Sequence, residues 1–173
     1  MRVNGLTLKY LLLLIAQVLL WNFCNFTQFL MVVYLPALVL FLPVRQSTPV
    51  TMLIAFLSGI AVDFFSVSPL GLTSLALVPV AASRQYVIRL VFGNEVYSRG
   101  ESLSANRQGW GKVVFSIFIV TLLFLAVYIF VDSAGVRPFW IDFLKCVISL
   151  IVAIPLSLYV VETLSSEESS RWR

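Results

Sequence analysis

The stretch Ala55–Gly71, AFLSGIAVDFFSVSPLG, places small residues, one acidic residue and a tight turn inside an otherwise apolar sequence. Ala55, Gly59 and Asp63 are spaced four residues apart, so a helix brings all three to one face. Helices in lipid gain no hydrophobic free energy by touching, and small side chains let their backbones approach closely. An unpaired carboxylate in hydrocarbon is costly. The row therefore predicts a face that looks into the protein and a partner for Asp63.

The composition is that of an integral membrane protein. The chain has 173 residues, of which 60% are hydrophobic and 12% are charged, and its mean hydropathy is +0.99. Several apolar runs approach the roughly 20 residues that a bilayer-spanning helix needs, and most connections between them are too short for a soluble domain. We expect one all-α domain of six transmembrane helices over residues 1–162.

Residues for metal, redox or enzyme chemistry are sparse. The sequence has no histidine, and its two cysteines, Cys24 and Cys146, lie in different apolar runs. It has no Gly-rich phosphate loop after a strand and no pair of carboxylates on one helix face near a polar pocket. The net charge of +4 is too small to indicate a nucleic-acid partner. We expect no enzyme activity, cofactor, metal or catalytic residue.

Turn and proline signals divide the apolar sequence. Pro36 and Pro155 lie inside apolar runs and predict kinks. Residues 66–69 form a four-residue turn in which Pro69 is placed to open the next helix, so the third and fourth spans should form a tight hairpin. The expected spans are about residues 10–24, 26–42, 50–65, 70–84, 113–131 and 139–161.

The distribution of basic residues predicts the topology. With the N-terminus in the cytoplasm, six spans leave both termini inside, with a cytoplasmic loop at residues 93–111 and a disordered cytoplasmic tail at 163–173. Of the 12 Lys and Arg residues, only Arg137 and Lys145 then fall on the outer side. This asymmetry follows the positive-inside rule and indicates a cytoplasmic membrane protein.

Two charged residues lie within the outer halves of the expected spans. Asp63 is near the outer end of the third span and Lys145 is about two turns below the outer end of the sixth. One hypothesis pairs them, directly or through water, because each alone is costly there. The alternative pairs Lys145 with Asp142, while Asp63 caps the turn that holds Ser66 and Ser68.

Basic and aromatic residues mark the expected membrane boundaries. Arg84 and Arg89 are a candidate cytoplasmic interface, for anionic lipid headgroups or for a protein partner, and their simpler interpretation is as positive-inside anchors. Trp21, Trp110 and Trp140 all lie at span ends. This placement is typical of an interfacial aromatic belt rather than of a ligand cage.

The segment Gly59–Gly71, GIAVDFFSVSPLG, followed by LTSLALVPVAA and a basic interfacial stretch, resembles the central hairpin of the MreD family. These are small rod-shape-determining membrane proteins of bacteria. The length, the six expected spans and the short N-terminus are also similar. The positions that match the family's glycine, acidic and S-P-L-G positions are Gly59, Asp63, Ser68, Pro69, Leu70 and Gly71.

The resemblance implies a non-catalytic scaffold of the cell-elongation machinery in the bacterial inner membrane. Such a scaffold binds the bitopic protein MreC and helps couple MreB filaments to peptidoglycan synthases. Membrane lipids and a second copy of the chain are further candidate partners, and nucleic acid is not. The residues with a partner-binding or structural role would be Ala55, Gly59, Asp63, Ser68, Pro69, Gly71 and Lys145, with Arg84 and Arg89 at the cytoplasmic interface.

The alternative function belongs to another class. The MreD family is similar in topology to the substrate-binding membrane subunits of vitamin uptake transporters, which also have six helices. Such a subunit needs an outward-facing polar pocket with several hydrogen-bonding side chains. The outer halves offer a sparse set: Asn22, Asn25, Gln28, Asp63, Ser68, Thr73, Asp142 and Lys145. A small-solute or lipid-headgroup site is therefore the competing hypothesis.

Overall fold

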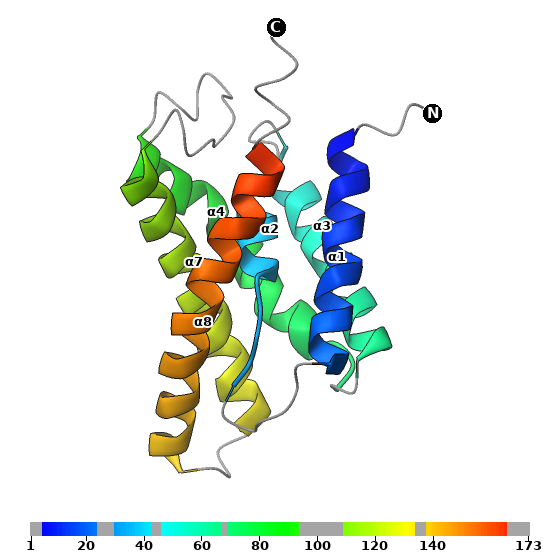
Figure 1. The fold of residues 1–173 in the computed structure, drawn as a ribbon, viewed down its shortest axis with the longest axis vertical. Helices are drawn as coiled ribbons and strands as arrows, with labels where there is room; N and C mark the ends of the chain where they lie inside the picture. The colour runs from blue at the N-terminus through cyan, green and yellow to red at the C-terminus, as the bar shows by residue number, and fades with distance from the viewer. Residues whose placement is uncertain are drawn as a thin grey trace, which may run out of the picture.

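The computed structural model describes residues 5–23, 30–42, 46–66, 69–93, 109–133 and 138–165, and over these residues it is helical with no strand. Four helices are long and apolar enough to cross a membrane, as in a multi-pass membrane protein, and the apolar helix over Leu8–Phe23 is shorter. The helices are α1 (Gly5–Phe23), α2 (Leu35–Leu40), α3 (Thr48–Phe65), α4 (Leu72–Phe92), α7 (Trp110–Ser133) and α8 (Phe139–Ser165) (Figure 1).

The second expected span is not a continuous helix. Residues 30–34 form no regular secondary structure, and the short helix α2 follows them. Pro36 occupies the first turn of α2, where its missing N–H costs no hydrogen bond, so it opens a helix instead of kinking one. The prediction of a spanning helix over 26–42 was wrong at residues 30–34, because an apolar run does not distinguish a helix from a buried irregular segment. Residues 26–29 of that span lie outside the described residues.

The third and fourth spans form the expected hairpin, with shifted boundaries. The fourth helix begins at Leu72, and Gly71 is its N-cap residue with a left-handed φ of 90°. Pro69 therefore precedes the helix and does not open it. Beyond Arg84 the same helix continues to Phe92, with Pro79 inside it.

The helices run up and down in an antiparallel bundle. The start of α1 and the end of α8 lie at the same end of the molecule (Figure 1). The Lys9 ammonium on α1 joins them by donating to the carbonyl oxygen of Thr163, 3.2 Å away. Helix α7 begins at Trp110 and α8 reaches Ser165, so both extend into segments expected as loop and tail. The rest of those segments, residues 94–108 and 166–173, lies outside the described residues.

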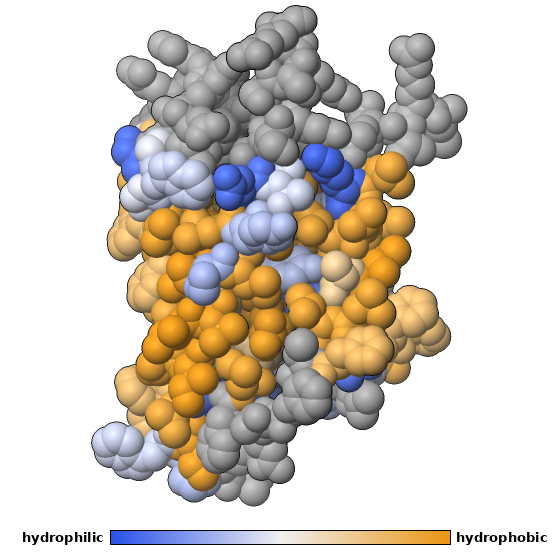
Figure 2. Space-filling view, in the orientation of Figure 1, coloured by the Kyte–Doolittle hydropathy of each residue, from blue (hydrophilic) through white to orange (hydrophobic). Residues whose placement is uncertain are grey.

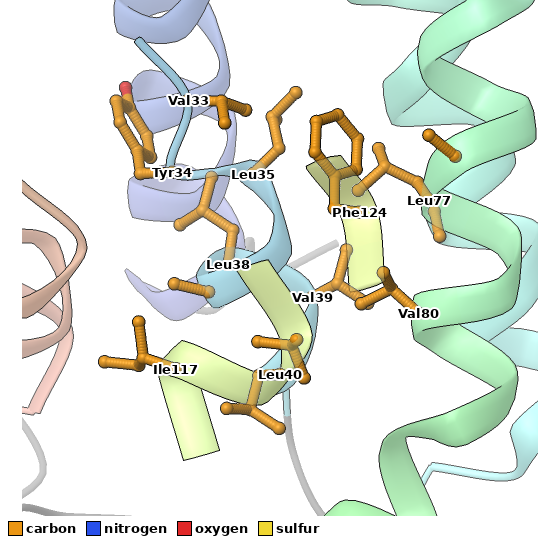
Figure 3. Packing of buried hydrophobic residues seen from close by; sticks show 14 of the residues in the cluster. Val33, Tyr34, Leu35, Leu38, Val39, Leu40, Leu77, Val80, Ile117 and Phe124 are labelled. Atoms are coloured by element: carbon orange, nitrogen blue, oxygen red, sulfur yellow. The ribbon is translucent and has the colours of Figure 1, made fainter. Parts of the chain in front are cut away.

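Helix α2 fills the centre of the bundle. Its six residues are all buried, and Leu35, Val39 and Leu40 have no exposed surface. Side chains of α4 and α7, including Leu77, Val80, Ile117 and Phe124, surround it (Figure 3). On the face that Figure 2 shows, apolar side chains cover most of the middle, and the most hydrophilic ones gather near the end where α1 begins. The bundle thus has an apolar belt outside and an apolar core built on α2.

Candidate functional site

The row of small residues on α3 packs against α4. A Cβ atom added at Gly59 would lie 2.6 Å from the Cα and backbone nitrogen of Ser74, closer than real Cβ atoms approach a backbone. The Ser74 hydroxyl donates to the carbonyl oxygen of Phe56 across the same contact, at 3.0 Å. Ala55 is fully buried. This face is therefore occupied within the chain, and it is not a free docking surface for a second protein.

Asp63 lies at the end of the same row and caps α4. Its Oδ2 accepts hydrogen bonds from the backbone N–H of Gly71 at 2.9 Å and of Thr73 at 3.0 Å. The first N–H groups of a helix have no intrahelical partner and carry partial positive charge, so a carboxylate there is doubly favoured. Only 1% of Asp63 is exposed. The structure thus places this residue inside the protein with backbone partners.

The turn residues contribute through their backbone. Gly71 adopts the left-handed conformation that turns its N–H toward the Asp63 carboxylate. The carbonyl oxygen of Pro69 accepts a hydrogen bond from the N–H of Leu72 at 3.2 Å. Ser68 lies outside the described residues. The hairpin is therefore closed by a side chain of α3 that binds the first turn of α4.

Lys145 pairs with a residue that neither hypothesis named. Its ammonium lies 3.3 Å from the carboxylate of Asp132 at the end of α7, and both side chains are largely buried. It bonds neither Asp63 nor Asp142. Helices α7 and α8 are antiparallel neighbours (Figure 1), and the contact between Asp132 and Lys145 lies between them. The ion pair therefore links these two helices and does not reach α3.

Aromatic rings join α1 to α7. Tyr128 lies on α7, one turn before Asp132. Its ring stacks on Phe124 at 5.8 Å and meets the edge of Trp21 on α1 at 6.0 Å. Tyr128 thus joins α7 to the end of α1.

Arg84 is not at the surface expected for a cytoplasmic interface. It is 2% exposed, and its guanidinium donates to the carbonyl oxygen of Leu40 at 2.9 Å and to that of Leu42. The last carbonyls of a helix lack intrahelical partners and carry partial negative charge. Arg84 therefore caps the C-terminal end of α2 from α4. Arg89, one turn further along α4, is exposed.

The irregular crossing at residues 30–34 is held by two side chains of α1, of which the sequence pattern indicated only Trp21, and that one as an interfacial aromatic residue. Gln17 of α1 donates to the carbonyl oxygen of Val32 at 2.9 Å and accepts from the N–H of Tyr34 at 3.1 Å. The indole N–H of Trp21 donates to the same carbonyl, at 2.8 Å. Trp21 is therefore a structural donor in addition to lying at a helix end.

Two further contacts complete this support. Ser149 of α8 accepts a hydrogen bond from the N–H of Met31 at 2.9 Å, and the Tyr34 hydroxyl donates to the Leu13 carbonyl at 2.6 Å. A non-helical backbone in a membrane must find such partners, since lipid offers none. The available sequence signal was Gln17, a polar amide in the middle of an apolar run.

The polar side chains described above mainly form hydrogen bonds with the chain's own backbone. Asp63, Arg84, Gln17 and Ser149 each bind main-chain atoms, and among the described residues no group of three His, Cys, Asp or Glu could hold a metal ion. The arrangement supports a rigid polar framework inside an apolar bundle. Comparison with family models, with curated proteins and with solved structures gives no match to this chain.

Proposed function

We propose that this chain is a non-catalytic scaffold of the bacterial cell-elongation machinery, placed in the cytoplasmic membrane with both termini inside. In this role it binds MreC and helps couple MreB filaments to peptidoglycan synthesis. The observation that carries the proposal is the hairpin at residues 59–71. Its sequence resembles the MreD family, and in the fold Gly59 and Asp63 join α3 to α4.

The filling of the bundle also favours a scaffold over a transport subunit. A solute-binding subunit needs polar side chains that converge on an open pocket. Here α2 occupies the centre, and the polar side chains of Gln17 and Arg84 bind backbone atoms next to its two ends. The filled centre therefore makes a vitamin-type uptake subunit the less favoured of the two candidate functions.

A depletion experiment tests the cellular role. Removing the chain from its rod-shaped host should widen and round the cells, and the wild-type chain should restore their width. The Gly59→Leu variant should fail to restore it, because the side chain collides with α4, whereas Gly111→Ala, at an open position, should succeed. Unchanged width after depletion would contradict the proposal.

Purification from mild detergent tests the partner. The wild-type chain should recover MreC in the same complex. Recovery without MreC but with a bound vitamin or with an ATPase module would instead establish the transport function. The Gly111→Ala variant serves as the control for tagging and extraction.

A further inference from the structure

The crossing segment, residues 30–34, leaves part of its backbone without a hydrogen-bond partner. Side chains of α1 and α8 bind the N–H groups of Met31 and Tyr34 and the carbonyl oxygen of Val32. Among the described residues, nothing bonds to the N–H or the C=O of Val33, which has no exposed surface. A buried backbone group without a partner costs about as much as a lost hydrogen bond. The protein alone therefore does not satisfy Val33.

Two hydroxyl groups on the helices around this segment are also unpartnered. The hydroxyls of Thr121 on α7 and Ser157 on α8 have no hydrogen-bond partner in the part of the chain that the structure describes, and both residues are fully buried. Ser116 of α7 is equally buried, but its hydroxyl donates to the carbonyl oxygen of Val113 at 2.8 Å. A buried hydroxyl can thus be satisfied by its own helix, and the two unpartnered ones are not.

The two hydroxyls lie at one level of the α7–α8 pair. These helices are antiparallel, and the contact between Asp132 and Lys145 fixes their register (Figure 1). Thr121 lies about 16.5 Å back along α7 from Asp132, and Ser157 lies about 18 Å onward along α8 from Lys145, at 1.5 Å per residue. The first distance is close to three full turns. Thr121 therefore shares with Asp132 the face of α7 that looks toward α8.

The crossing segment rises to this level beside α8. Ser149 and Ser157 share one face of α8 because they are eight residues apart, and Ser149 accepts the N–H of Met31 at 2.9 Å. Figure 1 shows the segment and α8 rising in the same direction. The extended backbone from Met31 to Leu35 covers at most about 14 Å, against about 12 Å along α8 from Ser149 to Ser157. Ser157 is therefore level with the start of α2.

Helix α7 reaches the start of α2 from its other side. Figure 3 shows Leu35, the first residue of α2, next to Phe124 of α7. Thr121 lies one turn from Phe124 and on the side nearer to α8. The unpartnered groups of Val33, Thr121 and Ser157 therefore gather around the start of α2, inside a bundle that is otherwise apolar.

Water is a ligand that fits such a set, because it both donates and accepts hydrogen bonds. A buried water molecule typically makes about three hydrogen bonds to groups that are otherwise unsatisfied. Non-helical backbone at membrane depth is tolerated where it meets protein or water. We propose that ordered water molecules bind inside the bundle between the crossing segment, Thr121 and Ser157, where they accept from the N–H of Val33 and donate to its C=O. This inference rests on the fold and not on the proposed function.

Proton-detected solid-state NMR of the full chain in bilayers of deuterated lipid tests the proposal. Magnetisation that starts on water protons reaches only those buried amides that lie beside bound water. The amide of Val33 should give a cross-peak with water. The amide of Val39 should give none, because this residue is equally buried but lies inside α2, so it is the matched control.

Two sets of variants locate the water. Thr121→Val combined with Ser157→Ala removes both unpartnered hydroxyls, and most of the water signal at Val33 should be lost because the water then has too few polar partners. Ser116→Ala removes a hydroxyl that is already bonded to its own helix, so it should leave the signal unchanged.

Two results would overturn the proposal. The first is the absence of a water cross-peak at Val33 in the wild-type chain, which would mean that the interior is dry there. The second is an equal signal at Val33 in the double variant and in the wild type, which would mean that these hydroxyls hold no water. If the double variant does not fold, the wild-type chain still decides, since equal water signals at Val33 and Val39 contradict a localised site.

Discussion

Gln17 binds Tyr34 across the centre of the bundle, where its Oε1 accepts the backbone N–H of Tyr34 at 3.1 Å while its Nε2 donates to Val32 at 2.9 Å. One amide side chain thus satisfies a donor and an acceptor of a backbone that forms no helix there. A helix supplies these bonds internally, and an irregular crossing in lipid cannot. The bundle therefore depends on polar side chains placed on helices that are otherwise apolar.

Replacing Gln17 by leucine should destabilise the fold. The change leaves the Tyr34 N–H buried without its partner, and the expected loss of unfolding free energy is about 2–3 kcal/mol. The matched control is Gln85→Leu on α4, which should change stability by less than about 0.5 kcal/mol. Unfolding by SDS titration from a mild detergent, followed by circular dichroism, measures both. Equal effects at the two positions would argue against the role assigned to Gln17.

Arg84→Leu should cost more than Arg89→Leu. The first change removes the cap from the carbonyls of Leu40 and Leu42 in the core, and we expect a loss of about 2–4 kcal/mol. Arg84→Lys should recover only part of it, because an ammonium does not reproduce the planar fork of a guanidinium. The same titration ranks the three variants. A larger loss at the exposed Arg89 would show that the basic pair acts chiefly at the surface.

Gly59→Ala and Gly111→Ala should shift stability in opposite directions. The Cβ at 59 meets the backbone of Ser74 at 2.6 Å and forces α3 and α4 apart, with an expected cost of about 1–3 kcal/mol. At 111 the added Cβ meets no atom within 4 Å, and the higher helix propensity of alanine should add about 0.5–1 kcal/mol. Thermal unfolding midpoints in one detergent provide the comparison. A stabilised Gly59→Ala variant would mean that the helices are not in close contact there.

Because Asp63 caps α4, its replacement by asparagine should cost less stability than its replacement by leucine. Asp63→Asn keeps an acceptor oxygen for the N–H groups of Gly71 and Thr73, whereas Asp63→Leu leaves both donors buried and unpaired. We expect Asp63→Leu to lose about 1–2 kcal/mol more than Asp63→Asn. Hydrogen exchange at the amide of Thr73 is the specific readout. It should accelerate in the leucine variant and stay slow in the asparagine variant, and equal rates in both variants would contradict the cap.

A charge-reversal cycle identifies the partner of Lys145. Lys145→Asp should destabilise the chain, and adding Asp132→Lys should restore most of the loss because the two side chains lie 3.3 Å apart. Adding Asp63→Lys instead should restore none of it. Recovery of stability with Asp63→Lys, and not with Asp132→Lys, would mean that Lys145 of α8 pairs with Asp63 of α3.

The sequence allowed the α3–α4 hairpin to be predicted, because its signals are local. The four-residue spacing of Ala55, Gly59 and Asp63 places them on one face whatever surrounds the helix. The cost of a charge in lipid then requires that face to turn inward. In the fold, this face packs on α4 and Asp63 binds the first turn of that helix.

The partners of Arg84 and Lys145 could not be predicted in the same way. Which side chain reaches which backbone depends on how the helices pack, and hydropathy carries no information on this. Arg84 was interpreted as an anchor because most membrane arginines lie at an interface. Its buried position follows from the early end of α2, which leaves the carbonyls of Leu40 and Leu42 in the core. No local signal in the sequence marks the end of α2, because it lies in a uniformly apolar run.

The central claim is that residues 30–34 cross the bundle without forming a helix. Backbone ¹³C chemical shifts of the labelled full chain in lipid nanodiscs test it most directly. We predict helical Cα shifts from Leu35 to Leu40 and non-helical shifts at Met31, Val32 and Val33. Helical shifts running without a break from 30 to 42 would contradict the account.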